Sequence, residues 1–433
     1  MTRYVIIGTG IAGFSAAETL RTLDPLAEIK MVSEDPHGFY SRPGLAYYLT
    51  GEIPQKQLFL FSRKGKLNLD VHHINGRVTR LDPISHTIDI NTPGRLTYDR
   101  LLIASGAISV PLEVPGANLR GMVKLDDLED TRQILALVGH TKTAVVVGGG
   151  VVAVELVEGL LAQGVKVHYF LRSDWFWPNV LGEVEARMVE RYLAHDEVII
   201  HHNTEILEIL GKRDKVSGVR TTKGSVISCD LVAVGIGVKS RMELAQAAGL
   251  KTERGILVNE YLQTSEPDIF AAGDVAQIFD PLSGHSSVDN LWYPGRKQGR
   301  VAAMNMAGQH QAYQRTVAVN VLRLAGVMTT IIGAVGSRHD DGQVYMTRGS
   351  SETWQELPNT ITTESGTEVS HVRLMVGEQV LLGALVMGDQ KISRPLRDMI
   401  NARVDISPIR KQLLQSGAQL GQSVMDYWIK TKG

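Results

Sequence analysis

Two loops in the chain have the glycine spacing that holds a dinucleotide phosphate. The first loop, Gly8 to Gly13, follows the apolar run Tyr4 to Ile7 and precedes a helical pattern. Glycine at Gly8 allows a tight turn, Gly10 lets the backbone approach a pyrophosphate, and Gly13 lets the helix pack on the sheet. The phosphate then meets the helix N-terminus, where free N–H groups favour negative charge. These three glycines therefore predict a dinucleotide site.

The second loop begins 140 residues later, counted from Gly8 to Gly148. It follows the apolar run Thr143 to Val147 and carries Gly148, Gly150 and Ala153, with alanine at a position where the pattern accepts it. A second helical stretch and strand come next. The chain thus contains two separate beginnings of a strand–turn–helix–strand nucleotide unit.

The residues expected to contact ribose differ between the two units. Glu34 stands 21 residues after Gly13, at the end of a predicted strand, where a carboxylate accepts hydrogen bonds from ribose hydroxyls. The second unit has Leu171 at that position and Arg172 after it. Without a carboxylate there is no repulsion against a 2′-phosphate, and a guanidinium binds one. This favours NADPH over NADH, with a surface arginine of no effect on specificity as the alternative.

Length and composition limit what else the chain can be. With 433 residues it is too long for one hydrophobic core, and 43% apolar with 21% charged residues indicates ordinary globular domains. Its 45 basic and 46 acidic residues give a net charge of −1, which does not favour a nucleic-acid partner. No apolar run is long enough for a transmembrane helix, and no residues show the spacing of a metal site.

The chain has one cysteine, Cys229. A single cysteine excludes an internal disulfide, a Cys-x-x-Cys pair and a cysteine-held iron–sulfur cluster. It suits a reducing compartment, and the start of the chain runs directly into a strand without a signal-peptide pattern, so we expect a cytoplasmic protein.

Several strands of the chain end in glycine, at Leu101 to Ala107, Leu231 to Gly237 and Asp268 to Asp274. With the two loops, these motifs in this order resemble the FAD-dependent pyridine nucleotide–disulfide oxidoreductase superfamily over about residues 1–310. Phe39 to Pro43 and Trp292 to Gly308 resemble its rubredoxin reductase, ferredoxin reductase and nitrite reductase flavin-domain branch.

The resemblance implies two sets of cofactor residues. In the superfamily the aspartate of the Gly-Asp motif holds the ribityl and pyrophosphate region of FAD, which implies this role for Asp274. The implied FAD residues are Gly8, Gly10, Gly13, Glu34, Arg42, Pro43, Ala104, Gly106, Gly273, Asp274 and Trp292. The implied NAD(P) residues are Gly148, Gly150, Ala153, Glu155, Arg172 and Gly235.

Two positions depart from the family pattern. Pro43 stands where CoA-disulfide reductases carry their nucleophilic cysteine, which disfavours disulfide reductase chemistry because that reaction needs a thiolate. Tyr47 stands where ferredoxin-reductase relatives place a lysine that pairs with a glutamate matching Glu155 near the flavin. We take Glu155 and Tyr47 as the candidate catalytic residues; either Tyr47 or Tyr48 offers a hydroxyl, or the ring simply packs.

The resemblance implies an α/β fold with two Rossmann-like domains, as in glutathione reductase, and a smaller α+β C-terminal domain. We expect a discontinuous FAD domain at 1–112 and 240–312, an NAD(P) domain at 113–239 and a C-terminal domain at 313–433. The last helical segment, from Ile409 to Ile429, either docks on its own domain or a dimer mate, or is an amphipathic anchor. A homodimer is one possible assembly.

The implied function is hydride transfer from NADPH or NADH to bound FAD, with electrons passed to an external redox protein. Two alternatives stay open at this point. The chain is an NAD(P)H oxidase or a reductase of quinones or other small molecules, or it is a flavin- and nucleotide-dependent sensor or scaffold with slow turnover.

Overall fold

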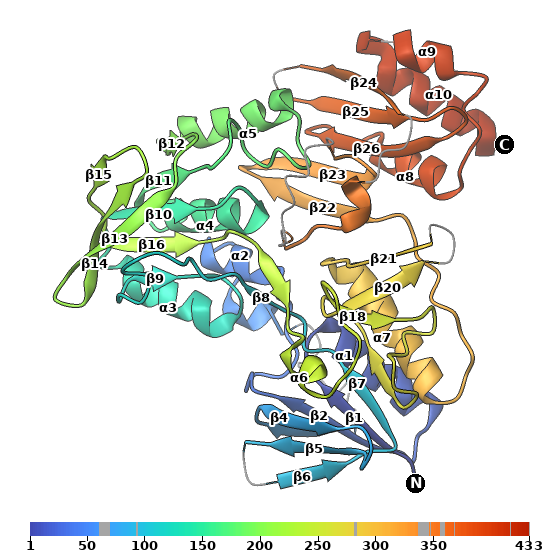
Figure 1. The fold of residues 1–433 in the computed structure, drawn as a ribbon. Helices are drawn as coiled ribbons and strands as arrows, with labels where there is room; N and C mark the ends of the chain where they lie inside the picture. Colours follow the sequence, from blue (N-terminus) through green and yellow to red (C-terminus); the bar gives the residue numbers. More distant parts are fainter. Residues whose placement is uncertain are drawn as a thin grey trace.

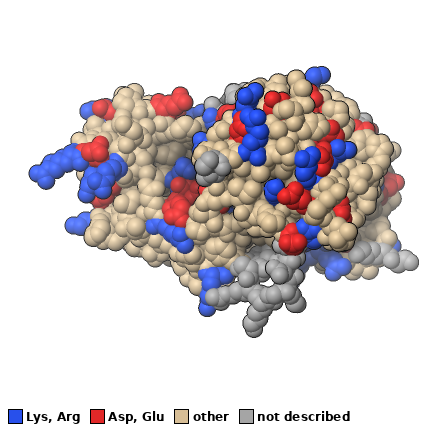
Figure 2. All heavy atoms as spheres, turned by 90° about the horizontal axis from the view of Figure 1, so that it is seen from below, with Lys and Arg blue, Asp and Glu red and all other residues tan. Residues whose placement is uncertain are grey.

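The chain folds into three lobes, each built on a five-stranded sheet (Figure 1). The computed structural model describes residues 1–59, 70–91, 94–280, 284–336, 346, 348–355, 360–367, 369–415 and 417–432. None of the helices within these ranges is long and apolar enough to cross a lipid bilayer. On the face seen in Figure 2, acidic and basic side chains are interspersed, in keeping with the net charge of −1.

The first lobe contains a parallel sheet with the strand order β19-β7-β1-β2-β3. Its strands are β1 (Arg3–Ile7), β2 (Glu28–Ser33), β3 (His72–Asn75), β7 (Arg100–Ile103) and β19 (Ile269–Ala271). Helix α1 (Ile11–Leu23) connects β1 to β2, and α7 (Trp292–Met306) packs against α1. Strands β1, β7 and β19 are buried apolar runs, as expected for a sheet covered on both faces.

The second lobe repeats this plan with the strand order β12-β11-β10-β16-β9. Its strands are β9 (Met122–Val123), β10 (Thr143–Val147), β11 (Lys166–Phe170), β12 (Ile199–His201) and β16 (Leu231–Val234). Its helices are α3 (Leu128–Val138), α4 (Val151–Ala162) and α5 (Glu183–His195). A small antiparallel sheet of β13 (Ile206–Lys212), β14 (Lys215–Thr221) and β15 (Val226–Ile227) adds to it.

Shorter elements complete and join these two lobes. The first lobe adds β4 (Val78–Asp82), β5 (Thr87–Ile90), β6 (Gly94–Thr97), β18 (Ile256–Val258), β20 (Ala276–Asp280), β21 (His285–Ser287) and α6 (Glu243–Ala247). Strands β8 (Ala107–Ser109) and β17 (Val238–Ser240) pair where the chain passes between the lobes. Helix α2 (Gly44–Leu49) and the short helix η1 (Gln55–Gln57) follow β2, and α2 packs against α4.

The third lobe is an antiparallel sheet with the order β22-β23-β26-β25-β24 and helices on one face. Its strands are β22 (Val319–Leu324), β23 (Val327–Gly333), β24 (Ile361–Gly366), β25 (His371–Val376) and β26 (Leu381–Met387). Its helices are η2 (Glu352–Gln355), α8 (Ser393–Asn401), α9 (Arg410–Gln415), η3 (Gly417–Gln419) and α10 (Leu420–Lys432). Two parallel sheets with helices and a smaller third lobe confirm the predicted fold class.

The C-terminal segment packs onto the sheet of its own lobe. Leu413, Leu420 and Val424 are buried in one core with Leu374 and Val386 of the sheet. This packing favours the interpretation in which the segment docks on its own domain, because an anchor for another surface would leave those side chains exposed.

Helices α1 and α7 approach each other so closely that a glycine is needed between them. A Cβ atom on Gly299 would lie 2.1 Å from the carbonyl oxygen of Ala12. Backbone cannot move aside as a flexible side chain does, so this position is closed to any other residue without a shift of α7. A Cβ on Gly295, on the same helix, would have ordinary contact distances, 3.4 Å from Ile11 Cγ2 and 3.8 Å from the Cα of Gly273.

We expect Gly299→Ala to lower the free energy of unfolding by about 1–3 kcal/mol, because the added methyl group forces the helices apart. The matched variant Gly295→Ala should be neutral or slightly stabilising, since alanine has the higher helix propensity. Urea unfolding of both variants measures the difference. Equal effects of the two substitutions would contradict the packing argument.

Candidate functional site

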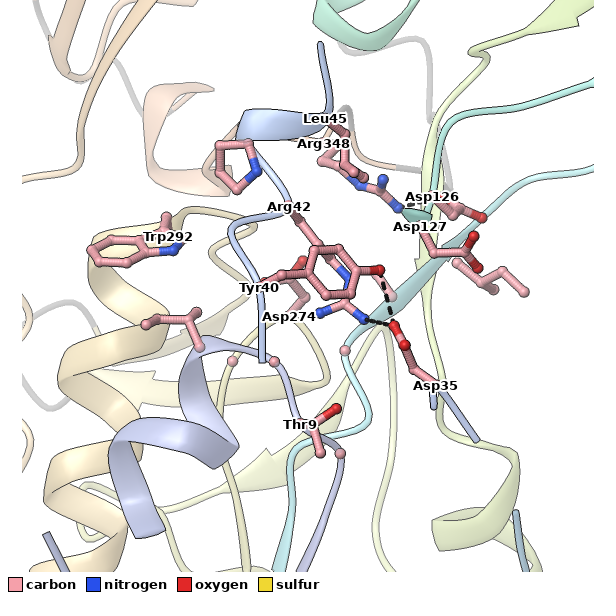
Figure 3. Close-up of a pocket in the computed structure, with 18 of the residues that line it drawn as sticks. Thr9, Asp35, Tyr40, Arg42, Leu45, Asp126, Asp127, Asp274, Trp292 and Arg348 are labelled. Carbon is pink, nitrogen blue, oxygen red and sulfur yellow. Dashed lines mark hydrogen bonds and ion pairs between the residues drawn. The ribbon is translucent and has the colours of Figure 1, made fainter. Parts of the chain in front are cut away.

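A cavity of about 800 Å³ lies where the three lobes meet. Its wall takes residues from the first glycine loop, from α2 and α4, and from β22 of the third lobe. Figure 3 shows Thr9, Asp35, Tyr40 and Arg42 converging on it, with Asp274 behind them. Its volume is within the range of sites that hold a large organic cofactor.

Close backbone packing shapes the loop at one end of this cavity. Gly8 has a φ of 107°, and a Cβ there would lie 2.2 Å from the carbonyl oxygen of Ala104. A Cβ on Gly13 would lie 2.1 Å from the carbonyl oxygen of Gly8, so Gly13 stands behind the loop and does not line the cavity. Gly10 does line it and is the N-cap of α1, which leaves the helix N-terminus open to a ligand.

The carboxylate of Glu34 lines the same end and is held by two arginines. Arg77 Nε lies 2.7 Å from Glu34 Oε2, and Arg241 Nη1 lies 2.8 Å from Oε1. Partial burial raises the pKa of Glu34, but the hydrogen bonds from Arg77 and Arg241 outweigh it and leave that pKa below the usual value. The carboxylate is therefore ionised at neutral pH and keeps lone pairs for ribose hydroxyls.

Arg42 brings a positive charge to the loop. Its Nη2 lies 3.3 Å from Asp35 Oδ2, and its guanidinium stacks 5.1 Å from the centre of the Tyr40 ring. Tyr40 donates a hydrogen bond of 2.9 Å to the same carboxylate (Figure 3). Since a Cβ on Gly10 would lie only 3.4 Å from Arg42 Nη1, this arginine is placed to bind a phosphate held at the α1 N-terminus.

Asp274 is a hydrogen-bond acceptor that the cavity leaves open. It follows Gly273, which has a φ of 81°, and it is partly buried at the cavity wall. Burial raises the pKa of this carboxyl, while the charges of Arg348 and Arg42 oppose the rise. Ser240 Oγ donates to the backbone carbonyl oxygen of Asp274 at 2.7 Å, but among the described residues no other side chain donates to its carboxylate, so the hydroxyls of a bound ligand can bind there.

A buried ion pair crosses the middle of the cavity. Arg348 Nη2 lies 2.5 Å from Asp126 Oδ1, and Arg348 Nη1 donates to the carbonyl oxygen of Leu125 at 2.9 Å (Figure 3). Burial would raise the pKa of Asp126, but the charges of Arg348 and Lys124 outweigh it and hold that pKa well below the usual value. Sequence reasoning did not predict this pair, because 222 residues separate its members.

Two carboxyl groups on α4 face the other end of the cavity. Glu155 and Glu158 are one helical turn apart, and both line the wall. Burial raises the pKa of each to about 7; the charge of Arg348 opposes this at Glu155, and that of Arg323 opposes it at Glu158. Both groups thus exchange a proton near neutral pH.

Tyr47, the other candidate catalytic residue, lies on α2 opposite these carboxyl groups. Its side chain lines the cavity and is half-exposed, and the guanidinium of Arg323 lies 5.4 Å from its ring centre. A Cβ on Gly159 of α4 would lie 2.4 Å from Leu49 Cδ2, and Gln163 donates to the carbonyl oxygen of Leu49 at 2.8 Å. Close packing of α2 on α4 therefore fixes Tyr47 relative to Glu155.

The structure brings most of the predicted residues to one cavity. Those that line it are Gly8, Gly10, Glu34, Arg42, Pro43, Tyr47, Ala104, Gly106, Glu155, Gly273, Asp274 and Trp292. The residues that sequence reasoning missed are Arg77, Asp126, Arg241, Arg323 and Arg348. Except for Glu155, the predicted residues of the second nucleotide unit lie outside it.

The second glycine loop repeats the packing of the first. Gly148 has a φ of 140°, and a Cβ there would lie 2.2 Å from the carbonyl oxygen of Gly235. A Cβ on Gly235 would in turn lie 2.9 Å from the backbone nitrogen of Ala153. Gly150 is the N-cap of α4. Arg172 is exposed just after β11, and no acidic side chain in the described part of the chain pairs with it.

A separate buried cluster joins the second and third lobes. Glu185 Oε1 lies 3.3 Å from His371 Nε2 and 2.9 Å from Arg373 Nε, and Glu364 Oε2 lies 3.5 Å from His371. Glu185, Glu364 and His371 are close enough to share a metal ion. Arg373 already supplies a positive charge to Glu185, so we interpret the cluster as an ion-pair network between lobes.

Comparisons with known proteins agree with this geometry. The sequence profile of the family described as "Pyridine nucleotide-disulphide oxidoreductase" matches residues 2–310. The "Assimilatory nitrate reductase electron transfer subunit" of Bacillus subtilis is 26% identical over 418 residues, or 95% of this chain and 51% of that protein. This chain thus spans about half the length of that relative.

Two further comparisons agree with the family match and with the fold. The "3-phenylpropionate/cinnamic acid dioxygenase ferredoxin--NAD(+) reductase component" of Photorhabdus laumondii is 32% identical over 314 residues, covering 70% of this chain and 77% of that protein. A ferredoxin reductase structure from Rhodopseudomonas palustris has a TM-score of 0.84 at 22% identity and covers 98% of this chain and 100% of that one. At that identity the structural match shows the fold alone.

We expect Asp274→Leu to weaken FAD binding roughly tenfold to a hundredfold, because the acceptor for ligand hydroxyls is lost. Asp274→Asn keeps an acceptor oxygen without the charge and should have an intermediate affinity. For the unchanged protein, affinity should fall as pH falls through the raised pKa of Asp274, and the asparagine variant should lose this dependence. Flavin fluorescence titration at several pH values measures the FAD affinity of the unchanged protein and of both variants. Unchanged affinity in the leucine variant would refute the role.

Proposed function

Because the chain belongs to the pyridine nucleotide–disulphide oxidoreductase family, we propose that it oxidises NAD(P)H with bound FAD and passes the electrons to a separate redox protein. FAD is the cofactor of this family, and the residues that line the cavity suit it. The backbone at Gly10 is open to a pyrophosphate, Arg42 adds charge there, and Glu34 and Asp274 accept hydrogen bonds from hydroxyls. When bound, FAD accepts a hydride and releases electrons singly or in a pair.

The observation that carries the proposal is that α4 belongs to both nucleotide sites. The second glycine loop forms the N-terminus of α4. The large cavity, which the first glycine loop also lines, is lined on another side by four residues of α4, Val151, Val152, Glu155 and Glu158. The phosphates of a dinucleotide held at Gly150 would therefore lie at the start of α4, the helix that also carries Glu155 and Glu158 of the cavity wall. This arrangement allows the nicotinamide to stack at the end of the cavity that Glu155 and Tyr47 line.

The chain offers no sulfur relay between the cavity and an acceptor. Cys229 is buried in the core of the second lobe, where burial raises the pKa of its thiol to about 12. Pro43, at the cavity, has no nucleophile. The acceptor must therefore approach the flavin itself, and the ferredoxin reductase relatives support a redox protein in this role.

A small-molecule acceptor is the second candidate function. A smaller, mainly apolar cavity of about 440 Å³ shares Pro43 and Tyr47 with the large one. Its other lining residues are Ser41, Gly44, Ile53, Gln57 and Phe59. A flat apolar acceptor such as a quinone fits such a lining, so an NAD(P)H-dependent quinone reductase is the alternative activity.

Anaerobic stopped-flow mixing of the FAD-loaded protein with NADPH tests the proposal. We expect the visible flavin absorbance to bleach within seconds and to return when an oxidised redox protein is added. Recovery with quinones or dioxygen alone would favour the second candidate or an oxidase. Bleaching that takes longer than minutes would contradict an enzyme and favour the sensor interpretation.

We also propose domain boundaries, a cellular location and a form of assembly. The sheets support a discontinuous FAD domain at 1–112 and 240–312, an NAD(P) domain at 113–239 and a C-terminal domain at 313–433. The single cysteine supports a cytoplasmic location. Exposed Ile361, on the edge strand β24, and exposed Val369, in the connection from β24 to β25, offer a contact for a homodimer.

Arg172 supports a preference for NADPH, because it is exposed, pairs with no acidic side chain of the described residues, and follows the strand end where we expect the ribose. We expect Arg172→Ala to weaken NADPH binding about tenfold or more and NADH binding less than about twofold. Arg213→Ala, at an exposed hairpin of the same lobe, is the control and should change neither constant. Isothermal titration measures the dissociation constants. Equal losses for both nucleotides in Arg172→Ala would refute the assigned role.

A further inference from the structure

Arg323 joins all three lobes at the wall of the cavity. It extends from β22 of the third lobe and forms an ion pair with Glu52, with Nη1 2.9 Å from Glu52 Oε2. Its Nε lies 4.0 Å from Oε1 of Glu158 on α4, and its guanidinium covers the ring of Tyr47 on α2 at 5.4 Å. One side chain thus touches both helices whose residues face the site of hydride transfer.

The ion pair with Glu52 alone does not explain this placement. Arg323, Tyr47 and Glu158 all line the cavity, whereas Glu52 does not. Glu158 also accepts a hydrogen bond from the backbone N–H of Gly326 at 3.2 Å, in the turn that follows β22. The third lobe therefore supplies both a cation and a backbone donor to a carboxyl group on α4.

The local charges show why a cation is needed here. Helix α2 has the sequence Gly-Leu-Ala-Tyr-Tyr-Leu and contributes no charged side chain, while α4 places two carboxyl groups at the cavity wall. Among the groups that shift the pKa of Glu158, Arg323 is the cation and Glu52 is a second carboxylate, while the charge of Arg348 acts on Glu155. If Arg323 were absent, Glu158 would face the negative charge that a hydride would bring to the flavin without a cation of its own.

We propose that Arg323 is a positioning residue for hydride transfer, holding Tyr47 and the carboxyl group of Glu158 at the cavity wall and supplying the positive charge that α2 lacks. This inference rests on the proposed function. The guanidinium suits both tasks, because its planar fork stacks on an aromatic ring while it pairs with carboxylates.

The test compares Arg323→Gln, Arg323→Lys and Glu52→Gln in the FAD-loaded protein. Glu52→Gln is the matched control, since it breaks the ion pair with Glu52 and leaves the cation at the wall. The measurements are the midpoint potential of bound FAD, the pH profile of flavin reduction by NADPH, and kcat and KM separately. FAD content and thermal unfolding check that each variant is folded.

We expect Arg323→Gln to lower the midpoint potential and to reduce kcat about tenfold or more, with KM changed less than about threefold. Loss of the cation raises the pKa of Glu158 further, so the limb of the pH profile that depends on its ionisation moves to higher pH. Arg323→Lys should keep the potential near that of the unchanged protein. Glu52→Gln should keep kcat and KM within about twofold and the potential near that of the unchanged protein, and its pH limb should move slightly to lower pH, because Glu52 raises the pKa of Glu158.

Equal effects of Arg323→Gln and Glu52→Gln would overturn the inference, because they would show an inter-lobe link alone. An unchanged potential and pH profile in Arg323→Gln would do the same. If that variant does not fold, Arg323→Met replaces it, because methionine keeps most of the apolar stem without the charge; an unchanged potential and pH profile in this variant contradict the inference. Failure of the proposed function is distinguishable, since NADPH would then not bleach the flavin of the unchanged protein.

Discussion

The carbonyl oxygen of Ala104 lies where a side chain at position 8 would begin, and the shape of the cavity depends on this close approach. A glycine at Gly8 lets the loop turn against the end of β7, and the turn exposes the N-terminus of α1. The same contact recurs between Gly148 and the carbonyl oxygen of Gly235 in the second lobe. Two helix N-termini, those of α1 and α4, are thus open to anionic ligands by one steric device.

Charge compensation is the second constraint on the cavity. Its carboxylates come from the first and second lobes, and arginines from later in the chain balance them: Arg241 for Glu34, Arg348 for Asp126 and Arg323 for Glu158. A buried charge without a partner is costly, so the pairs made by Arg348 and Arg323, which link the third lobe to the second, stabilise the arrangement in which the lobes enclose the site. The third lobe therefore contributes to the electrostatics of a site whose nucleotide-binding loops it does not carry.

The absence of a thiol at the cavity limits the chemistry that the fold can perform. Members of this family that reduce disulfides need a thiolate beside the flavin, and in this chain Pro43 and Tyr47 line the cavity, with no cysteine among its described lining residues. Under the proposed function, electrons that enter through FAD would therefore leave from the flavin itself. The two carboxyl groups with a pKa of about 7, Glu155 and Glu158, are the cavity groups suited to exchange a proton during this transfer.

Local rules in the sequence predicted the two nucleotide loops and the place of Glu34, since a glycine spacing, a strand run and the residue at a strand end all lie within about thirty residues of one another. The resemblance to the superfamily implied the fold class and the role of Asp274. It also implied that Tyr47 occupies the position of the lysine that usually pairs with the glutamate matching Glu155. Only the tertiary structure decided which arginines pair with the carboxylates of the cavity wall. Coulomb attraction acts through space, and Arg323 and Arg348 pair with residues some two hundred positions away in the chain.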